Sequence, residues 1–156
     1  MTGGHGTAAA RVSPIVDGKK PLVLIAETIP KHLQLLATAF RQAGFEARTA
    51  SSCQECLDIF INIRDQVDLV LLNGTIPGEK GIDLVIKIRR IKRDQRILVV
   101  VTEFNTRAHA MEFGAEVVFS NPLDPQAVVQ RAANLLRQDD SFRIRRHQRL
   151  AQLQAV

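Results

Sequence analysis

Short apolar runs alternate with amphipathic segments along most of this chain. Runs that are apolar almost throughout and no longer than six residues are typical of strands covered on both faces of a sheet. Another short segment, 45–49, alternates apolar and polar residues, which also predicts a strand. The five predicted strands cover 22–25, 45–49, 67–72, 97–101 and 116–119.

Between these runs, apolar residues recur every three or four positions, which predicts helices. The first helix starts at Pro30 and stops before Gly44, the second follows Ser51-Ser52 and runs to about Arg64, and the third covers 81–93. A short helix is expected at 106–113, and Asp124 is expected to cap a last one. The buried positions we expect are Leu33, Leu36, Ala37, Phe40, Leu57, Phe60, Ile61, Ile82, Val85, Ile86, Val128, Val129, Ala132, Leu135 and Leu136, with Ile88 or Arg89 beside them.

Five repeats of strand and helix therefore fill residues 21–138. Parallel strands joined through helices by right-handed crossovers form one sheet with helices on both faces. We predict a single doubly wound α/β domain over 21–138. The flanking segments are expected to be a mostly disordered 1–20 and a basic helical or flexible tail or linker at 139–156.

The composition suits one such domain, because 156 residues with 46% apolar content can bury a sizeable core. No apolar run approaches the roughly 20 residues of a membrane helix. The first 20 residues also lack the charged start and apolar centre of a secretion signal. We expect a cytoplasmic protein that does not enter membranes.

The net charge of +5 is concentrated in two places. Six basic residues lie within 87–96 and four arginines within 143–149. Such clusters can meet nucleic acid, anionic lipid or an acidic protein. A solvated helix face is the simpler interpretation of the first cluster, and the lack of Trp and Tyr weakens base stacking.

The two cysteines, Cys53 and Cys56, have the spacing of a CxxC motif. Two thiols one helical turn apart can form a redox or metal site. No second pair or histidine cluster completes a zinc site in the sequence. We favour packing, with Cys56 on the buried side of a capped helix, and expect no metal site.

Asn73 follows the central apolar run and is followed by Gly74. In open α/β sheets, ligands bind at the carboxyl ends of the strands. A functional site is therefore expected around Asn73, whose side chain is a neutral amide.

The order and spacing of several segments resemble the receiver domain of bacterial response regulators. The matching segments are LVLIAE at 22–27, RTASSCQECLDIF at 48–60, DLVLLNGTIPGEKG at 68–81, VVVT at 99–102 and FGAEVVFSNP at 113–122. The resemblance implies a flavodoxin-like, CheY-like five-stranded sheet in the order 2-1-3-4-5. It also implies a role in two-component signal transduction.

The resemblance also places the family's active positions on this sequence. The phosphoacceptor aspartate falls on Asn73, and the two acids after the first strand fall on Ala26 and Glu27. The hydroxyl after the fourth strand is kept, the small residue after it is Glu103, the lysine falls on asparagine, and the switch aromatic falls on valine. The resulting degenerate pocket comprises Ala26, Glu27, Asn73, Thr75, Thr102, Glu103, Val118 and Asn121.

These changes predict a pseudo-receiver. An amide is far less nucleophilic than the carboxylate that an aspartyl phosphate requires. Magnesium prefers charged oxygen ligands, although a weak divalent ion between Glu27 and Glu103 stays open. We expect no catalytic residues and no cofactor, and a module that binds a signalling protein or itself.

Two alternatives rest on the basic segments. Arg145, Arg146 and Arg149 resemble the opening segment of PilZ domains, which implies possible cyclic di-GMP binding as the front part of a longer protein, against a plain amphipathic helix. Nucleic-acid binding through both basic clusters is the third hypothesis. An enzyme has little support, because the four histidines lack visible acid or thiol companions and are interpreted as surface residues: His5, His32, His109 and His147.

Overall fold

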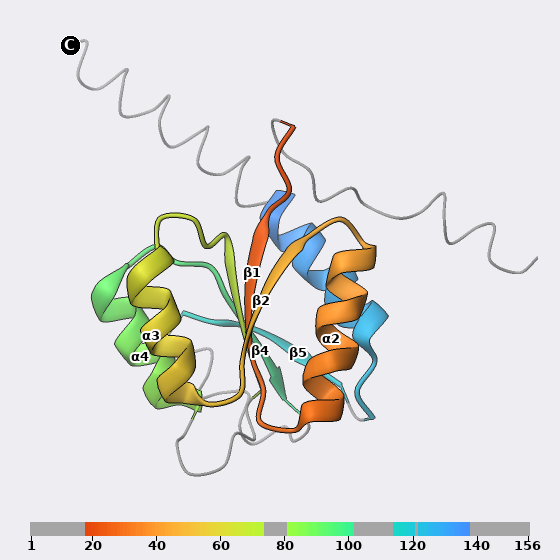
Figure 1. The fold of residues 1–156 in the computed structure, drawn as a ribbon, viewed down its shortest axis with the longest axis horizontal. Helices are drawn as coiled ribbons and strands as arrows, with labels where there is room; N and C mark the ends of the chain where they lie inside the picture. The colour runs from red at the N-terminus through yellow and green to blue at the C-terminus, as the bar shows by residue number, and fades with distance from the viewer. Residues whose placement is uncertain (1–17, 74–80, 102–113, 121, 138–156) are drawn as a thin grey trace, which may run out of the picture.

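The computed structural model describes residues 18–73, 81–101, 114–120 and 122–137 (Figure 1). Five parallel strands form one sheet in the order β2-β1-β3-β4-β5. The predicted doubly wound sheet and its strand order are confirmed. The strands are β1 (Leu22–Ala26), β2 (Glu46–Ala50), β3 (Leu69–Asn73), β4 (Ile97–Val101) and β5 (Glu116–Phe119).

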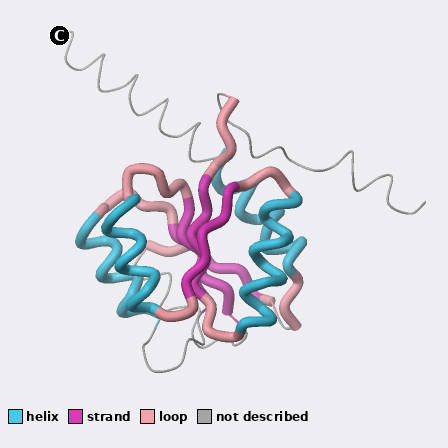
Figure 2. Tube along the Cα trace, in the orientation of Figure 1, coloured by secondary structure: helices cyan, strands magenta, loops and turns pink. Residues whose placement is uncertain are grey.

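Four helices cover the two faces of this sheet (Figures 1 and 2). They are α2 (Pro30–Gln42), α3 (Cys53–Ile63), α4 (Gly81–Ile91) and a last helix at 125–137. The helices α3 and α4 lie together on one face, and α2 and the 125–137 helix lie on the other (Figure 1). None of the helices in the described residues is long and apolar enough to cross a bilayer.

The strand sequences explain why the sheet is covered on both faces. Successive side chains of a strand point to opposite faces. In β1, Leu24 joins the apolar cluster under α3 and α4, whereas Ile25 joins the cluster under α2 and the last helix. Every residue of β1 and of β4 is buried. The sheet therefore separates two apolar layers, and in its inner strands β1, β3 and β4 polar side chains are confined to the strand ends.

The predicted helix starts are confirmed where the structure describes them. Pro30 occupies the first turn of α2. The Ser52 hydroxyl accepts a 3.0 Å hydrogen bond from the Glu55 backbone N–H at the start of α3. The Asp124 carboxylate accepts one of 3.3 Å from Ala127 N–H at the start of the last helix. Local capping thus sets where these helices begin.

Several predicted buried positions differ from the structure, and Leu33 and Leu57 are only half-buried. Ile61 of α3 is 48% exposed, because the buried stripe runs through Cys53, Cys56 and Phe60. On α4 the buried apolar stripe includes Leu84, which the sequence prediction omitted, and Ile86 is only half-buried. In both helices a short apolar-rich segment allows more than one stripe, and only the packing selects between them. The expected helix at 106–113 lies outside the described residues.

Candidate functional site

The carboxyl ends of the parallel strands meet at one edge of the sheet. Ala26 at the end of β1 pairs with Leu72 of β3, so Glu27 and Asn73 follow at the same level on adjacent strands. Asn73 in turn pairs with Val100 of β4. The structure therefore brings together three of the predicted pocket residues, Ala26, Glu27 and Asn73, at the edge where open α/β sheets bind ligands.

Ala26 takes the place where the resemblance expects an acid. Its methyl group is 1% exposed and packs in the apolar cluster beneath α3 and α4. A methyl group offers no ligand to a cation and no charge to a phosphoryl group. One of the three carboxylate positions is therefore occupied by core packing.

Glu27 retains a carboxylate, and this carboxylate is almost entirely buried at 1% exposure. Its backbone N–H donates to Ala50 O at 3.0 Å, which continues the pairing of β1 with β2 by one residue. Its Oε1 lies 3.2 Å from Nδ1 of His32. Its Oε2 has no hydrogen-bond partner within the described part of the chain.

His32 was interpreted from the sequence as a surface residue without an acid companion; the part about the missing acid companion was wrong. The ring is 37% exposed and contacts Glu27 from the first turn of α2. Only Thr28 and Ile29 separate Glu27 from Pro30, so the chain turns at once from strand to helix and carries His32 back over the carboxylate. The sequence contained a signal for this contact. An acid at the end of a strand is followed by a proline that starts a helix, and a histidine lies in the first turn of that helix.

Asn73 is the half-buried last residue of β3. Its side chain is a neutral amide, so among the described residues the donor set at this edge contains one charged oxygen group, from Glu27. Magnesium requires several hard oxygen ligands in near-octahedral geometry and gives up its water reluctantly. Across the described residues, no group of three or more His, Cys, Asp or Glu side chains could hold a metal ion. The described residues therefore do not fit magnesium.

Val118 occupies the predicted aromatic position on β5. It is half-buried, pairs with Val100 and packs against the apolar cluster under α2. The other predicted pocket residues, Thr75, Thr102, Glu103 and Asn121, lie outside the described residues. The same holds for Arg145, Arg146 and Arg149, so cyclic di-GMP binding stays a prediction from the sequence.

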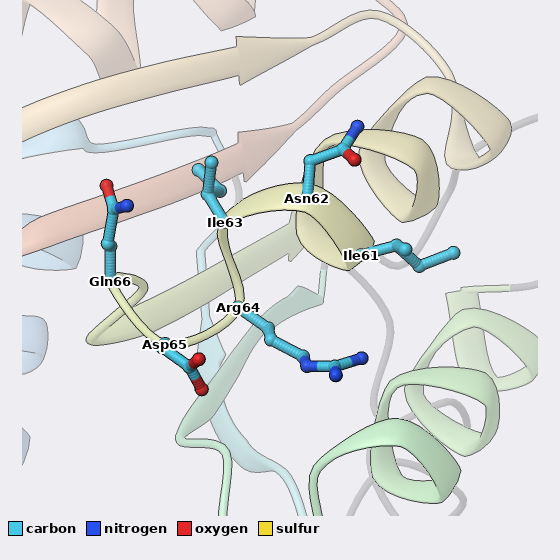
Figure 3. Close-up of a pocket in the computed structure, with 6 residues that line it drawn as sticks. All are labelled: Ile61, Asn62, Ile63, Arg64, Asp65 and Gln66. Atoms are coloured by element: carbon cyan, nitrogen blue, oxygen red, sulfur yellow. The ribbon is translucent and has the colours of Figure 1, made fainter.

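A surface hollow of about 200 Å³ lies at the opposite edge of the sheet. Residues 61–66 line it, and Figure 3 shows them around the last turn of α3. This turn precedes β3, which begins at Leu69, so the hollow belongs to the amino edge. It is separate from Glu27 and Asn73 and carries none of the predicted pocket residues.

The CxxC cysteines pack in the core. Cys53 is 2% exposed and Cys56 is fully buried, and both are thiols. Burial raises the pKa of the Cys56 thiol to about 12, and the nearby Cys53 and Glu55 raise it further. A thiol that stays protonated is a poor nucleophile and metal ligand, which supports the packing interpretation.

The basic cluster at 87–96 is not a uniform solvated face. Arg89 donates to the carbonyl oxygens of Arg93, Gln95 and Gly114 at 2.8, 2.6 and 2.6 Å. Burial, and then the nearby Arg96, lower the pKa of Arg89. Arg96 itself lies 3.7 Å from Glu116. The solvated-face interpretation therefore holds for the exposed Lys87, Arg90 and Arg93. Arg89 instead joins the segments before β4 and β5 through hydrogen bonds.

Comparison with known proteins agrees with this geometry. The family model described as "Response regulator receiver domain" matches residues 23–133. Among curated proteins, the chain is 27% identical over 125 residues to the phosphate regulon transcriptional regulatory protein PhoB of Pseudomonas aeruginosa, covering 76% of this chain and 52% of that protein. It is 32% identical over 124 residues to the transcriptional regulatory protein BaeR of Escherichia coli, covering 78% and 50%. The chain thus spans about half the length of these relatives.

Solved structures share the fold. A receiver domain protein from Clostridium thermocellum superposes with a TM-score of 0.71 at 23% identity, covering 78% of this chain and 98% of that one. A CheX–CheY complex with beryllofluoride and magnesium from Borrelia burgdorferi gives 0.70 at 24% identity, covering 76% and 90%. At these identities the likeness concerns the fold alone.

Proposed function

Because the chain belongs to the response regulator receiver domain family of two-component signal transduction, we propose that it is a pseudo-receiver that works without phosphorylation. In this proposal it is a cytoplasmic, non-enzymatic module that transmits a signal by binding a protein partner or a second copy of itself. Its partner surface is available without an aspartyl phosphate.

One observation carries the proposal: Asn73 ends the central strand β3 at the edge where the family's nucleophile would stand. A carboxylate oxygen attacks phosphorus and keeps the phosphoryl group as an acyl phosphate. The amide of Asn73 is neutral and far less nucleophilic. The methyl group of Ala26 beside it supports the same conclusion, because at the end of β1 the cation that would offset phosphoryl charge finds one carboxylate in place of two.

Binding to a partner is supported by the family and by the stable framework beneath the site. The solved CheX–CheY complex shows one receiver of this fold bound to another protein. In the present chain, α2, α3, α4 and the 125–137 helix pack on an intact sheet. Loss of the nucleophile has therefore not been accompanied by loss of the fold, as expected for a module kept for binding.

The proposal is tested by incubating the full chain with acetyl phosphate and magnesium and measuring its intact mass. We expect no gain of a phosphoryl group on the native chain. Asn73→Gln is the matched control, because it keeps the amide and must behave like the native chain. A stoichiometric phosphoryl adduct that the Asn73→Gln variant loses would overturn the proposal.

The partner half of the proposal has its own test. The native chain is used as bait in a lysate of its source, with and without acetyl phosphate, and its oligomeric state is measured at several concentrations. We expect the same partner, or the same dimer, in both conditions. Capture that depends on acetyl phosphate would contradict phosphorylation-independent binding.

A further inference from the structure

The buried carboxylate of Glu27 needs a partner for its charge, and a side chain of this chain contacts it. A carboxylate taken out of water is costly unless it is paired or hydrogen-bonded. Glu27 is 1% exposed. In the described residues, the one side chain that contacts its carboxylate is His32, at 3.2 Å.

The chemistry of the two groups fixes how they interact. An ionised carboxylate only accepts hydrogen bonds, so with Glu27 ionised the 3.2 Å contact requires the proton on Nδ1 of His32. The carboxylate also lies just before the first turn of α2, where backbone N–H groups give the helix a partial positive charge. That first turn contains no acidic side chain of its own, and the N-cap residue Ile29 has no side-chain hydrogen bond. Glu27 and His32 therefore join the end of β1 to the start of α2.

We propose that His32 takes the role that a divalent cation has in a receiver: it is the built-in partner of the buried carboxylate, and it makes this edge of the sheet independent of metal. His32 acts here as a positioning residue. It holds Glu27 and the turn into α2 in one arrangement, whatever the magnesium concentration. This inference rests on the proposed function, since it explains how a pocket without phosphoryl chemistry is kept in order.

The unpartnered oxygen of Glu27 makes the proposal testable. While His32 holds Oε1, one oxygen remains for a cation, and Asn73 and Ala26 add no charge. When the imidazole is removed, both oxygens of a buried carboxylate need a partner. A divalent ion that enters from the space left by the ring then gains the whole carboxylate.

The experiment measures Mn²⁺ and Mg²⁺ binding by calorimetry, and thermal unfolding with and without each ion, on the full chain. We expect the native chain to show no ion-dependent rise in Tm. The variant His32→Ala is expected to have a lower Tm that Mn²⁺ restores in part, and to bind Mn²⁺ roughly tenfold more tightly than the native chain, a change equivalent to about 1.4 kcal/mol. Gln34→Ala, an exposed position on the same helix, is the matched control and must behave like the native chain.

A second substitution identifies the ion's ligand. In the double variant His32→Ala/Glu27→Gln, the rescue by Mn²⁺ must disappear, because the amide no longer attracts the ion. Rescue that persists in the double variant would place the ion elsewhere and overturn the proposal. Equal responses of the native chain and His32→Ala to Mn²⁺ would overturn it too.

One measurement needs no substitution. Heteronuclear NMR of the native chain distinguishes which ring nitrogen of each histidine carries a proton. We expect His32 to show a protonated Nδ1, and a neutral ring protonated at Nε2 alone would contradict the assigned hydrogen bond. These results are separate from the phosphorylation test: an adduct with acetyl phosphate would refute the proposed function, whereas only the metal and NMR results decide the role of His32.

Discussion

Polar side chains at the two edges of the sheet differ in their hydrogen-bond partners. At the amino edge, Asp68 Oδ2 accepts a 2.8 Å hydrogen bond from the backbone N–H of Leu22. Arg89 donates to three carbonyl oxygens in the segments that lead into β4 and β5. At the carboxyl edge, the buried Glu27 has one side-chain contact in the described residues, and its Oε2 has none.

This difference distinguishes side chains that stabilise the fold from side chains that belong to the site. Polar groups that bond to the backbone of neighbouring segments hold those segments together and stabilise the fold. A buried charge with an incomplete set of partners stabilises little and is typical of a site. We therefore expect substitutions at the amino edge to affect folding, and those at the carboxyl edge to affect ligand response.

The largest effect is expected for Arg89→Met, which keeps much of the apolar stem but removes the donors to Arg93, Gln95 and Gly114. A hydrogen bond from a charged group contributes more than a neutral one, so the loss should lower the free energy of unfolding by about 3 kcal/mol. Gly114, whose carbonyl accepts one of these bonds, has a φ of +78°, a conformation that suits glycine. Urea unfolding measures the change.

Arg90→Met is the control for this prediction. Arg90 is exposed on the same helix, and its substitution should change stability by less than about 0.5 kcal/mol. Equal losses for the two variants would remove the structural distinction between Arg89 and the rest of the basic cluster.

A smaller effect is expected for Asp68→Ala. The Leu22 N–H at the start of β1 would lose its acceptor, with a cost of about 1 to 2 kcal/mol. Chemical denaturation measures the change, with the exposed Asp65→Ala as the comparison. If Asp65→Ala cost as much, the effect of Asp68 would be general charge and not this hydrogen bond.

At the carboxyl edge, Glu27→Gln is expected to change stability by less than about 1 kcal/mol in either direction. The amide keeps an oxygen for the His32 N–H and removes a buried charge, and replacement of a buried charge is often nearly neutral. A loss of unfolding free energy as large as that of Arg89→Met, measured in the same urea series, would show that polar side chains at both edges stabilise the fold. That result would contradict the difference between the two edges.

The last prediction concerns the ionisation of Cys56, which affects stability only in alkali. Its pKa is raised from 9.0 to about 12 in the folded chain, so the unfolded chain loses the thiol proton first. The stabilisation is therefore complete below about pH 9 and is lost as the pH rises towards 12. Cys56→Ser should lessen this decline in Tm between those values. An unchanged decline would show that other groups cause it.

Most of the fold was predictable because it follows from local patterns of apolar and polar residues. The runs 97–101 and 116–119 became β4 and β5 with the predicted bounds, since an apolar run flanked by polar residues has few other solutions. The exposure of Ile61 was not predictable, because neighbouring stripes on α3 are equally apolar in sequence. Only contact with the sheet selects the stripe through Cys56 and Phe60.

The site was predictable in part. The position of Asn73 followed from the strand that precedes it, and its neighbours Ala26 and Glu27 followed from the resemblance. The sequence analysis missed the contact between Glu27 and His32, and it missed the hydrogen bonds from Arg89 to backbone carbonyls of other segments. Both depend on how a side chain reaches across a turn, over 5 and 25 positions, and hydrophobic periodicity contains no information about such reach.

The central claim is that the end of β3 cannot accept a phosphoryl group, and the most direct measurement is a heteronuclear NMR titration of the native chain with beryllofluoride and magnesium. Beryllofluoride mimics an acyl phosphate when a carboxylate binds it. We predict no change in the signals of Glu27, Asn73 and the rest of the carboxyl edge at any concentration of the mimic. A saturable change centred on Asn73 would contradict the account.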